Sequence, residues 1–224
     1  MNIKMIVMLT NHDKTVKDAL ELFEDCKNIL VEHWGFKDVG LPVVQMKRLV
    51  RNMKNAKKKT FLEVVSYTEK ECIKATELAI ECKFDYLMGT MFFQSVYDLL
   101  KSKPIKYMPF CGKVSGSPSV LEGSINEIIA HAKSIEEKNV YGFDLLAYRY
   151  TGDPEELAQK FIKELNLPVI IAGSINSFEK LEKVKELNPW GFTIGSAFFD
   201  KNFVKGGSFK EQIERVVKYL ENSK

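Results

Sequence analysis

The chain has 224 residues, and its 33 basic and 30 acidic side chains leave a formal net charge of only +3. This near balance does not indicate a nucleic-acid partner, and the basic stretch 47–59 fits the wet face of an amphipathic helix. The four cysteines show no metal-ligand spacing, which predicts reduced thiols, no bound metal and a cytoplasmic location. No signal pattern begins the chain and no apolar run approaches the ~20 residues that span a bilayer, so no membrane association is expected.

Apolar runs and helical patterns alternate along the chain about eight times. Apolar, strand-like runs are expected at 3–10, 36–41, 60–67, 84–88, 105–110, 140–148, 167–175 and 190–199. Helices are expected at 16–30, 43–56, 68–83, 92–100, 125–138, 155–165, 176–187 and 208–220. Several helix starts carry capping-box spacing, in which Ser or Thr is followed three residues later by Glu, as at Thr68, Ser124 and Ser208.

This regular alternation predicts parallel βαβ units, and eight of them close a TIM (β/α)8 barrel. A single barrel domain over residues 1–224 is therefore expected, with a doubly wound open sheet as the alternative. The first strand-to-helix turn, residues 10–14, contains no glycine. Because a dinucleotide-binding fold needs glycines in that turn, no nicotinamide or other cofactor is expected.

Two Gly-Ser pairs stand one helix apart, Gly173-Ser174 and Gly195-Ser196, each at the end of an apolar run. Such turns bring unhindered backbone N–H groups together, and the second pair opens a short helix at 197–199. Either pair alone would serve only a tight turn. Together they predict a phosphate-binding site at the ends of strands seven and eight of the barrel.

The motifs Pro-Val-Ile-Ile-Ala-Gly-Ser-Ile and Gly-Phe-Thr-Ile-Gly-Ser-Ala-Phe resemble the phosphate-binding end of the ribulose-phosphate-binding barrels. That group includes phosphoribosyl isomerases, pentulose-phosphate epimerases and hexulose-phosphate synthases. The resemblance implies a phosphorylated substrate rather than one reaction. The chain lacks the Asp-x-Lys strand motif of the hexulose-phosphate and orotidylate enzymes and the paired strand-end aspartates of the histidine-pathway isomerase, so those activities are not implied.

Charged residues inside three expected strands are the candidates for chemistry, because a charge in mid-strand should face the barrel interior. Lys37 and Glu63 lie on neighbouring strands and are expected to meet, either as a structural ion pair or as a proton-transferring pair. Alternation lets only one of Lys37 and Asp38 face inward. Asp144, between apolar Phe143 and Leu145, is the leading candidate for general acid or base.

Three further residues are assigned to the mouth of the barrel. Arg149, after the sixth strand, is expected to clamp a carboxylate or phosphate, with helix capping or a surface position as the alternative. His12 is a candidate acid or base that would otherwise cap the first helix. Lys113 lies in the long Gly/Ser-rich stretch 111–124, which is expected to be either a lid over the phosphate or a mobile loop.

Two classes of function remain open from the sequence. The first is an isomerase, epimerase or carbon–carbon lyase that acts on a small phosphorylated metabolite by proton transfer. The second is a non-catalytic barrel that senses a phosphometabolite, as do antiterminator proteins that resemble these barrels. The sequence identifies neither the substrate nor the oligomeric state, for which a homodimer is one option.

Overall fold

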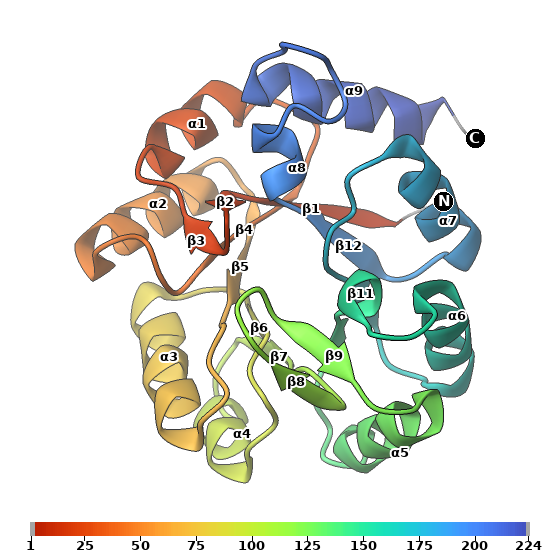
Figure 1. The fold of residues 1–224 in the computed structure, drawn as a ribbon. Coiled ribbons are helices and arrows are strands. Elements are labelled where there is room, and N and C mark those ends of the chain that lie inside the picture. The colour runs from red at the N-terminus through yellow and green to blue at the C-terminus, as the bar shows by residue number, and fades with distance from the viewer. Residues whose placement is uncertain (1–2, 223–224) are drawn as a thin grey trace.

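The computed structural model describes residues 3–222, and its main feature is one sheet of eight parallel strands in the order β10-β11-β12-β1-β4-β5-β6-β7. The two edge strands meet, because the backbone N–H of Tyr141 donates to the carbonyl of Tyr107 (2.9 Å) and that of Asp144 donates to Pro109 (3.1 Å). The sheet thus curls into a barrel with the helices around it (Figure 1). The predicted TIM barrel is confirmed, and the open-sheet alternative is excluded.

The barrel strands are shorter than the apolar runs that predicted them. They are β1 (Lys4–Met8), β4 (His33–Lys37), β5 (Lys59–Glu63), β6 (Tyr86–Met88), β7 (Lys106–Met108), β10 (Phe143–Leu145), β11 (Val169–Ile171) and β12 (Gly191–Ile194). Four two- or three-residue strands, β2 (Thr10–Asn11) with β3 (Lys14–Thr15) and β8 (Lys113–Ser115) with β9 (Val120–Glu122), form two antiparallel hairpins outside the barrel sheet.

The helices follow the expected order. They are α1 (Ala19–Cys26), α2 (Val43–Asn55), α3 (Glu69–Cys82), α4 (Gln94–Leu100), α5 (Ile125–Glu136), α6 (Pro154–Glu164), α7 (Phe178–Leu187), α8 (Ser196–Phe199) and α9 (Phe209–Glu221), with a 3-10 turn η1 (Ala147–Arg149). The hydroxyls of Thr68, Ser124 and Ser208 each accept the N–H of the glutamate three residues later, as the capping boxes predicted. None of the helices within residues 3–222 is long and apolar enough to cross a membrane.

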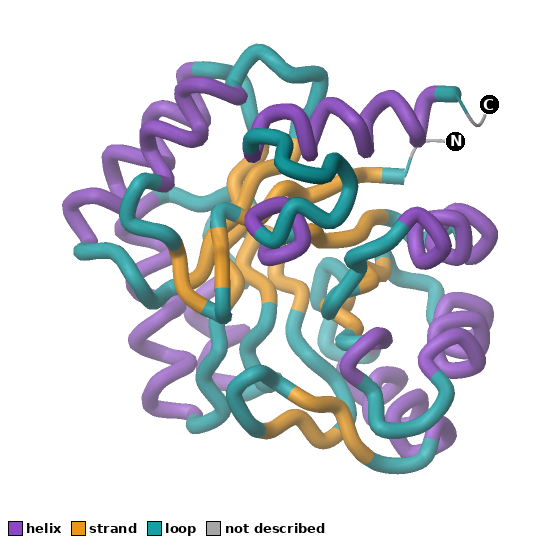
Figure 2. The backbone as a smooth tube through the Cα atoms, turned by 45° about the horizontal axis from the view of Figure 1, so that its top comes forward, coloured by secondary structure: helices purple, strands orange, loops and turns teal. Residues whose placement is uncertain are grey.

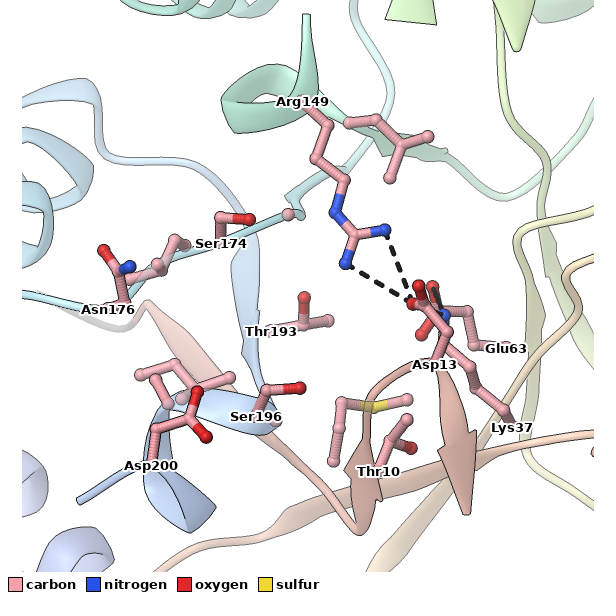
Figure 3. A pocket seen from close by; sticks show the side chains of 17 residues that line it. Thr10, Asp13, Lys37, Glu63, Arg149, Ser174, Asn176, Thr193, Ser196 and Asp200 are labelled. Carbon is pink, nitrogen blue, oxygen red and sulfur yellow. Dashed lines mark hydrogen bonds and ion pairs between the residues drawn. The ribbon is translucent and has the colours of Figure 1, made fainter. Parts of the chain in front are cut away.

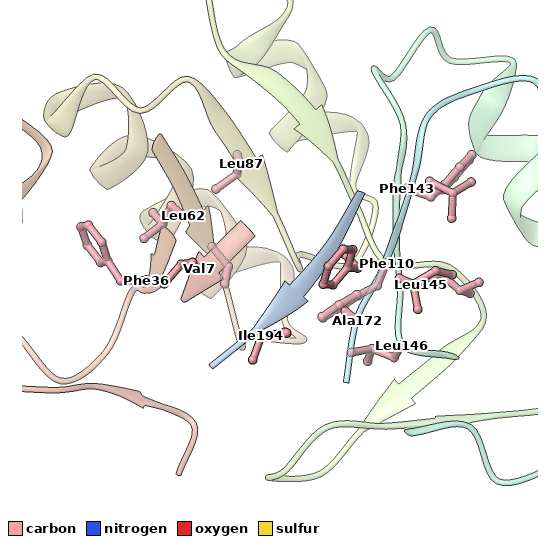
Figure 4. Packing of buried hydrophobic residues seen from close by; sticks show 14 of the residues in the cluster. Val7, Phe36, Leu62, Leu87, Phe110, Phe143, Leu145, Leu146, Ala172 and Ile194 are labelled. Carbon is pink, nitrogen blue, oxygen red and sulfur yellow. The ribbon is translucent and has the colours of Figure 1, made fainter. Parts of the chain in front are cut away.

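The main hydrophobic core lies between the outward faces of the strands and the helices. Residues such as Leu62, Leu87 and Leu145 project from the strands into this layer and are fully buried (Figure 4). The tube view shows the strands in the centre and the helices outside them (Figure 2). Burying alternate strand residues in this way fixes the strand register, so the intervening residues must face the barrel interior.

The barrel interior divides into two layers. The lower layer, toward the N-terminal ends of the strands, is aromatic: Phe61 stacks on Tyr86 with ring centroids 4.1 Å apart, and Trp190, Tyr141 and His33 pack around them. The upper layer, toward the C-terminal ends, carries polar and charged side chains. Its members are Thr10, Lys37, Glu63, Asp144 and Thr193.

Candidate active site

A cavity of about 160 Å³ opens at the C-terminal ends of the strands. It is the end of the barrel where the active sites of such folds lie. Most of the residues that the sequence assigned to the site line this one cavity, namely Lys37, Glu63, Arg149, Gly173, Ser174, Gly195 and Ser196 (Figure 3).

The two Gly-Ser turns form one wall of the cavity. Gly173 and Ser174 both have positive φ, +89° and +42°, so the chain after β11 bends sharply there. Gly195 precedes the first turn of α8, and a Cβ atom at Gly195 would lie 2.9 Å from the carbonyl oxygen of Thr10. A side chain does not fit at that position, so glycine is needed for the two loops to approach each other.

The opposite wall is a cluster of four charges. The ammonium of Lys37 lies 2.7 Å from Asp13 Oδ1 and 3.4 Å from Glu63 Oε1. Arg149 reaches the same Asp13 oxygen from above, with both terminal nitrogens at 3.4 Å. The contact between Lys37 and Glu63, which are direct cross-strand partners, is the one predicted from the sequence.

The charge states of this cluster follow from its contacts. Burial on its own lowers the pKa of Lys37, but the carboxylates of Glu63 and Asp13 outweigh it and hold that pKa above its ordinary value. Burial likewise raises the pKa of Asp13, yet its hydrogen bond to Lys37 and the charges of Lys37 and Arg149 bring it below the usual range. Lys37 is therefore an ammonium and Asp13 a carboxylate at neutral pH.

Asp144 faces the barrel interior, as alternation predicted, but it lies beneath the cavity rather than in its wall. Its cross-strand partner is Ile170, an interior residue, and only 1% of Asp144 is exposed. Neither carboxylate oxygen has a hydrogen-bond partner among the described residues. Burial, and after it the charge of Glu63, raises the pKa of Asp144 well above its ordinary value, so the site favours the protonated form of this carboxyl group.

Asp13 reaches the cluster because of the β2–β3 hairpin. Thr15 pins the base of the hairpin to β4, since its hydroxyl donates to the carbonyl of Lys37 (2.8 Å) and accepts the N–H of Lys37 (2.9 Å). The turn residues His12 and Asp13 both have positive φ, +45° and +59°. This two-residue turn directs Asp13 into the cavity and leaves His12 exposed.

His12 is therefore placed differently from its expected position as an acid or base. It does not line the cavity, and its backbone N–H donates to Ser196 Oγ at 3.2 Å. The neighbouring Asp13 occupies the place foreseen for it. A turn of two residues gives inward and outward directions to adjacent side chains, which the sequence alone did not resolve.

The segment that holds Lys113 is a hairpin, not the expected lid or mobile loop. Lys113 begins β8 and pairs with Glu122 of β9 at 3.6 Å, with 77% of its side chain exposed. It does not line the cavity. Gly and Ser residues here serve the antiparallel turn, so their abundance did not indicate a phosphate contact.

The choice between Lys37 and Asp38 is settled by the strand. Lys37 faces the interior, whereas the Asp38 carboxylate accepts the N–H of Val65 at 3.4 Å. Burial raises the pKa of Asp38 to about 6. Asp38 thus supports the loop after β5 instead of entering the cavity.

Several polar residues that the sequence analysis did not single out complete the cavity wall: Thr10, Asp13, Asn176, Thr193 and Asp200. Lys180 stands behind the first Gly-Ser turn, where its ammonium donates to the carbonyl of Ser174 at 2.8 Å. The positions of the cavity residues follow from strand ends and loop shape, and of them only Thr193 lies within a motif noted in the sequence. Within residues 3–222, no group of three or more His, Cys, Asp or Glu side chains is arranged to hold a metal ion.

The sequence matches no protein-family model, and no curated protein is similar to it. Solved structures are similar in fold. N-(5'-phosphoribosyl)anthranilate isomerase from Pyrococcus furiosus aligns over 98% of this chain and 99% of its own, with a TM-score of 0.66 and 15% identity.

Two further structures extend the comparison. N-acetylmannosamine-6-phosphate 2-epimerase from Clostridium perfringens covers 97% of this chain and 93% of its own (TM-score 0.65, 13% identity). A glycerol uptake operon antiterminator regulatory protein from Listeria monocytogenes covers 88% and 93% (TM-score 0.60, 17% identity). The protein thus has the (β/α)8 barrel fold that these three solved structures share.

Proposed function

We propose that this protein is an enzyme that transfers a proton within a small phosphorylated metabolite, as an isomerase or epimerase does. The observation that carries this proposal is the shape of the cavity, which has two Gly-Ser turns on one side and a cluster of buried charges on the other. Backbone N–H groups at such turns suit a phosphate. A phosphate held there would present the carbon skeleton of its own molecule to Glu63 and Lys37.

Glu63 is the residue best placed to move the proton. Its carboxylate lines the cavity and is one of two acidic partners of Lys37. Removing a proton from the carbon next to a carbonyl leaves negative charge on the carbonyl oxygen, which the ammonium of Lys37 would stabilise. The proton then returns to a different carbon or to the opposite face.

Asp144 would act through Glu63, since it does not line the cavity. The charge of Glu63 adds to burial in raising the pKa of Asp144. Asp144 would therefore be a positioning residue beneath Glu63 rather than the base itself.

The charge on Lys37 favours proton transfer over a lyase that forms a Schiff base. A lysine attacks a carbonyl only when its amine is neutral, which usually requires a lowered pKa. Two carboxylates instead raise the pKa of Lys37. Among the reactions open from the sequence, isomerisation and epimerisation agree best with this arrangement.

The phosphate site can be tested by binding. We expect glycerol 3-phosphate and inorganic phosphate to raise the melting temperature of the wild type, because a ligand that binds only the folded state stabilises it. Ser196→Asp places a carboxylate at the second turn and should abolish this shift. Ser102→Asp, at an exposed position between α4 and β7 at the far end of the barrel, adds the same charge and should leave the shift unchanged.

Serine is a better position for this test than glycine. A leucine at Gly195 would collide with the backbone of Thr10 and disturb the fold, so lost binding could not be assigned to the site. An unchanged melting shift in the folded Ser196→Asp variant would show that phosphate does not bind at the two Gly-Ser turns.

The reaction can be tested without knowledge of the product. Pentose and hexose phosphates incubated with the enzyme in D₂O should lose the NMR signal of the exchanged C–H bond if the protein abstracts a proton from carbon. The fold likeness to an antiterminator protein supports a second candidate, a sensor that binds phosphometabolites without turnover. Ligand-induced stabilisation with no exchange for any stabilising ligand would favour the sensor.

A further inference from the structure

Arg149 connects the two walls of the cavity. It ends the 3-10 turn after β10, and its side chain passes directly over Gly173: a Cβ atom at Gly173 would lie 2.7 Å from Arg149 Cγ. The missing side chain of Gly173 therefore makes room for the arginine stem. From there the guanidinium reaches across the cavity toward Asp13 (Figure 3).

The contact between Arg149 and Asp13 leaves most of the guanidinium's capacity unused. Both terminal nitrogens approach the same oxygen, Oδ1, at 3.4 Å each, and that oxygen also accepts the closer ammonium of Lys37. Strong pairs of arginine and carboxylate use two parallel bonds to two oxygens at about 2.7–2.9 Å. Arg149 can thus form a better pair with a carboxylate that presents both of its oxygens.

Asp13 is an internal carboxylate that stands where such a group would bind. Its side chain is 17% exposed at the tip of the β2–β3 hairpin, whereas the base of the hairpin is fixed through Thr15. Rotation of this one side chain would release Arg149 without unpinning the hairpin. The cavity therefore already binds one carboxylate, supplied by the chain itself.

A second, independent feature indicates a ligand at the same place. Thr10 lines the cavity, and its buried hydroxyl oxygen has no hydrogen-bond partner among the described residues. Buried polar atoms without partners are rare in folded proteins. A bound ligand with oxygen acceptors would satisfy this hydroxyl.

We propose that the substrate carries a carboxylate as well as its phosphate, and that Arg149 binds this carboxylate through both ends of its guanidinium in place of Asp13. The inference rests on the proposed phosphate site and narrows its ligand to phosphorylated carboxylic acids. Asp13 pairs with both Lys37 and Arg149 in the structure. In the complex the substrate carboxylate takes over Arg149.

Two probes that differ by one group test the inference. 3-Phosphoglycerate and glycerol 3-phosphate both carry a phosphate on a three-carbon chain, but only the first has a carboxylate. By calorimetric titration the wild type should prefer 3-phosphoglycerate. Arg149→Met keeps the stem over Gly173 and should weaken 3-phosphoglycerate about ten- to a hundredfold, the usual size for a lost charged hydrogen-bond pair, with little effect on glycerol 3-phosphate.

Two control variants separate the clamp from general electrostatics. Arg215 of α9 lies outside the cavity, over the ring of Phe178. Arg215→Met should leave the affinities for 3-phosphoglycerate and glycerol 3-phosphate unchanged. Asp13→Asn should tighten 3-phosphoglycerate more than glycerol 3-phosphate, because it frees Arg149. Asp200 lines the same cavity and forms no ion pair among residues 3–222. Asp200→Asn should therefore raise the affinity for both ligands alike.

The outcomes distinguish this inference from the proposed function. If Arg149→Met weakens both ligands equally, Arg149 is a phosphate contact and the carboxylate clamp is overturned while the phosphate site stands. Equal effects of Asp13→Asn and Asp200→Asn on the two ligands would also overturn it. If the wild type binds neither ligand in the concentration range of cellular metabolites, the phosphate site and the clamp both fail.

Discussion

The two layers of the barrel interior are built on the same strands but differ in how their polar groups are satisfied. Phe61 and Glu63 are two residues apart on β5, yet one stacks in the aromatic lower layer and the other pairs with Lys37 in the charged upper layer. In the lower layer Lys106 lies over the rings of Tyr141 (4.3 Å) and Tyr86 (5.1 Å). The ammonium of Lys106 is thus stabilised by contact with these aromatic rings.

In the upper layer, some buried polar groups lack hydrogen-bond partners. Among the described residues, Thr10 and Asp144 of this layer have buried side-chain oxygens without a hydrogen-bond partner, and so do Asn11 and Tyr148, which follow β1 and β10 in the chain. A stable core avoids such groups, and a binding site has a use for them. This difference agrees with the proposal that the upper layer, and not the lower one, binds a ligand.

The largest expected effect comes from the upper layer. Glu63→Gln removes the proposed base and should lower the rate of C–H exchange by about 100- to 10,000-fold. The free energy of unfolding, measured by urea denaturation, should change far less, because Asp13 remains the closer partner of Lys37. A variant that exchanges normally but unfolds easily would make the pair of Lys37 and Glu63 purely structural.

The matching change in the lower layer should have the opposite signature. Phe61→Ala removes a fully buried ring that stacks on Tyr86 and should cost about 3–5 kcal/mol of stability. Activity per folded molecule, measured at low temperature, should stay close to that of the wild type. A large loss of activity in folded Phe61→Ala protein would show that the two layers are not independent.

The sequence predicted more of the fold than of the site. Strand alternation was enough to predict the barrel, the meeting of Lys37 with Glu63 and the inward direction of Asp144, because side chains on a strand alternate strictly. The part of Asp13 was not predictable. It depends on a hairpin whose turn has two residues at positive φ and no glycine, so no turn signal marked it.

Two other errors share a physical cause. The Gly/Ser-rich stretch around Lys113 was read from composition, which does not distinguish a loop from a hairpin. His33 falls outside the expected strand 36–41, although it begins β4 and packs against Phe61 and Trp190. Tertiary contacts decided both places, and local patterns do not record those contacts.

Titration of His33 tests how well the lower layer is sealed from water. Burial lowers the pKa of His33 to about 4 from its ordinary 6.5. Between these values the unfolded chain binds a proton that the folded protein does not, so stability is present above pH 6.5 and is lost as the pH falls toward 4. The loss amounts to about 3 kcal/mol at 1.36 kcal/mol per pKa unit.

His33→Gln should remove this part of the acid sensitivity. Urea denaturation at pH 7 and pH 4.5 measures it as the difference between wild type and variant, in which the titration of all other groups cancels. An identical pH dependence in both proteins would mean that His33 is protonated in the folded state and that the lower layer is less sealed than its packing indicates.

Asp144, in the upper layer, should make stability depend on pH with the opposite sign to His33. Its effect over one pH unit should be the smallest of these changes. Its pKa is raised in the folded protein, by burial first and by the charge of Glu63 second. Below pH 3.8, its ordinary value, both states hold the proton. Above that the unfolded chain releases the proton while the folded protein keeps it, so stability falls as the pH rises toward the folded pKa.

Asp144→Asn has no proton to lose and should escape this decline. As the pH rises above 3.8, its advantage in unfolding free energy over the wild type should grow, by at most about 1.4 kcal/mol per pH unit, until the pH passes the raised pKa of Asp144. If the difference stays constant over this range, Asp144 is ionised in the folded protein. It would then be a buried anion that needs a partner, and its part beneath Glu63 would be that of a charge rather than a protonated acid.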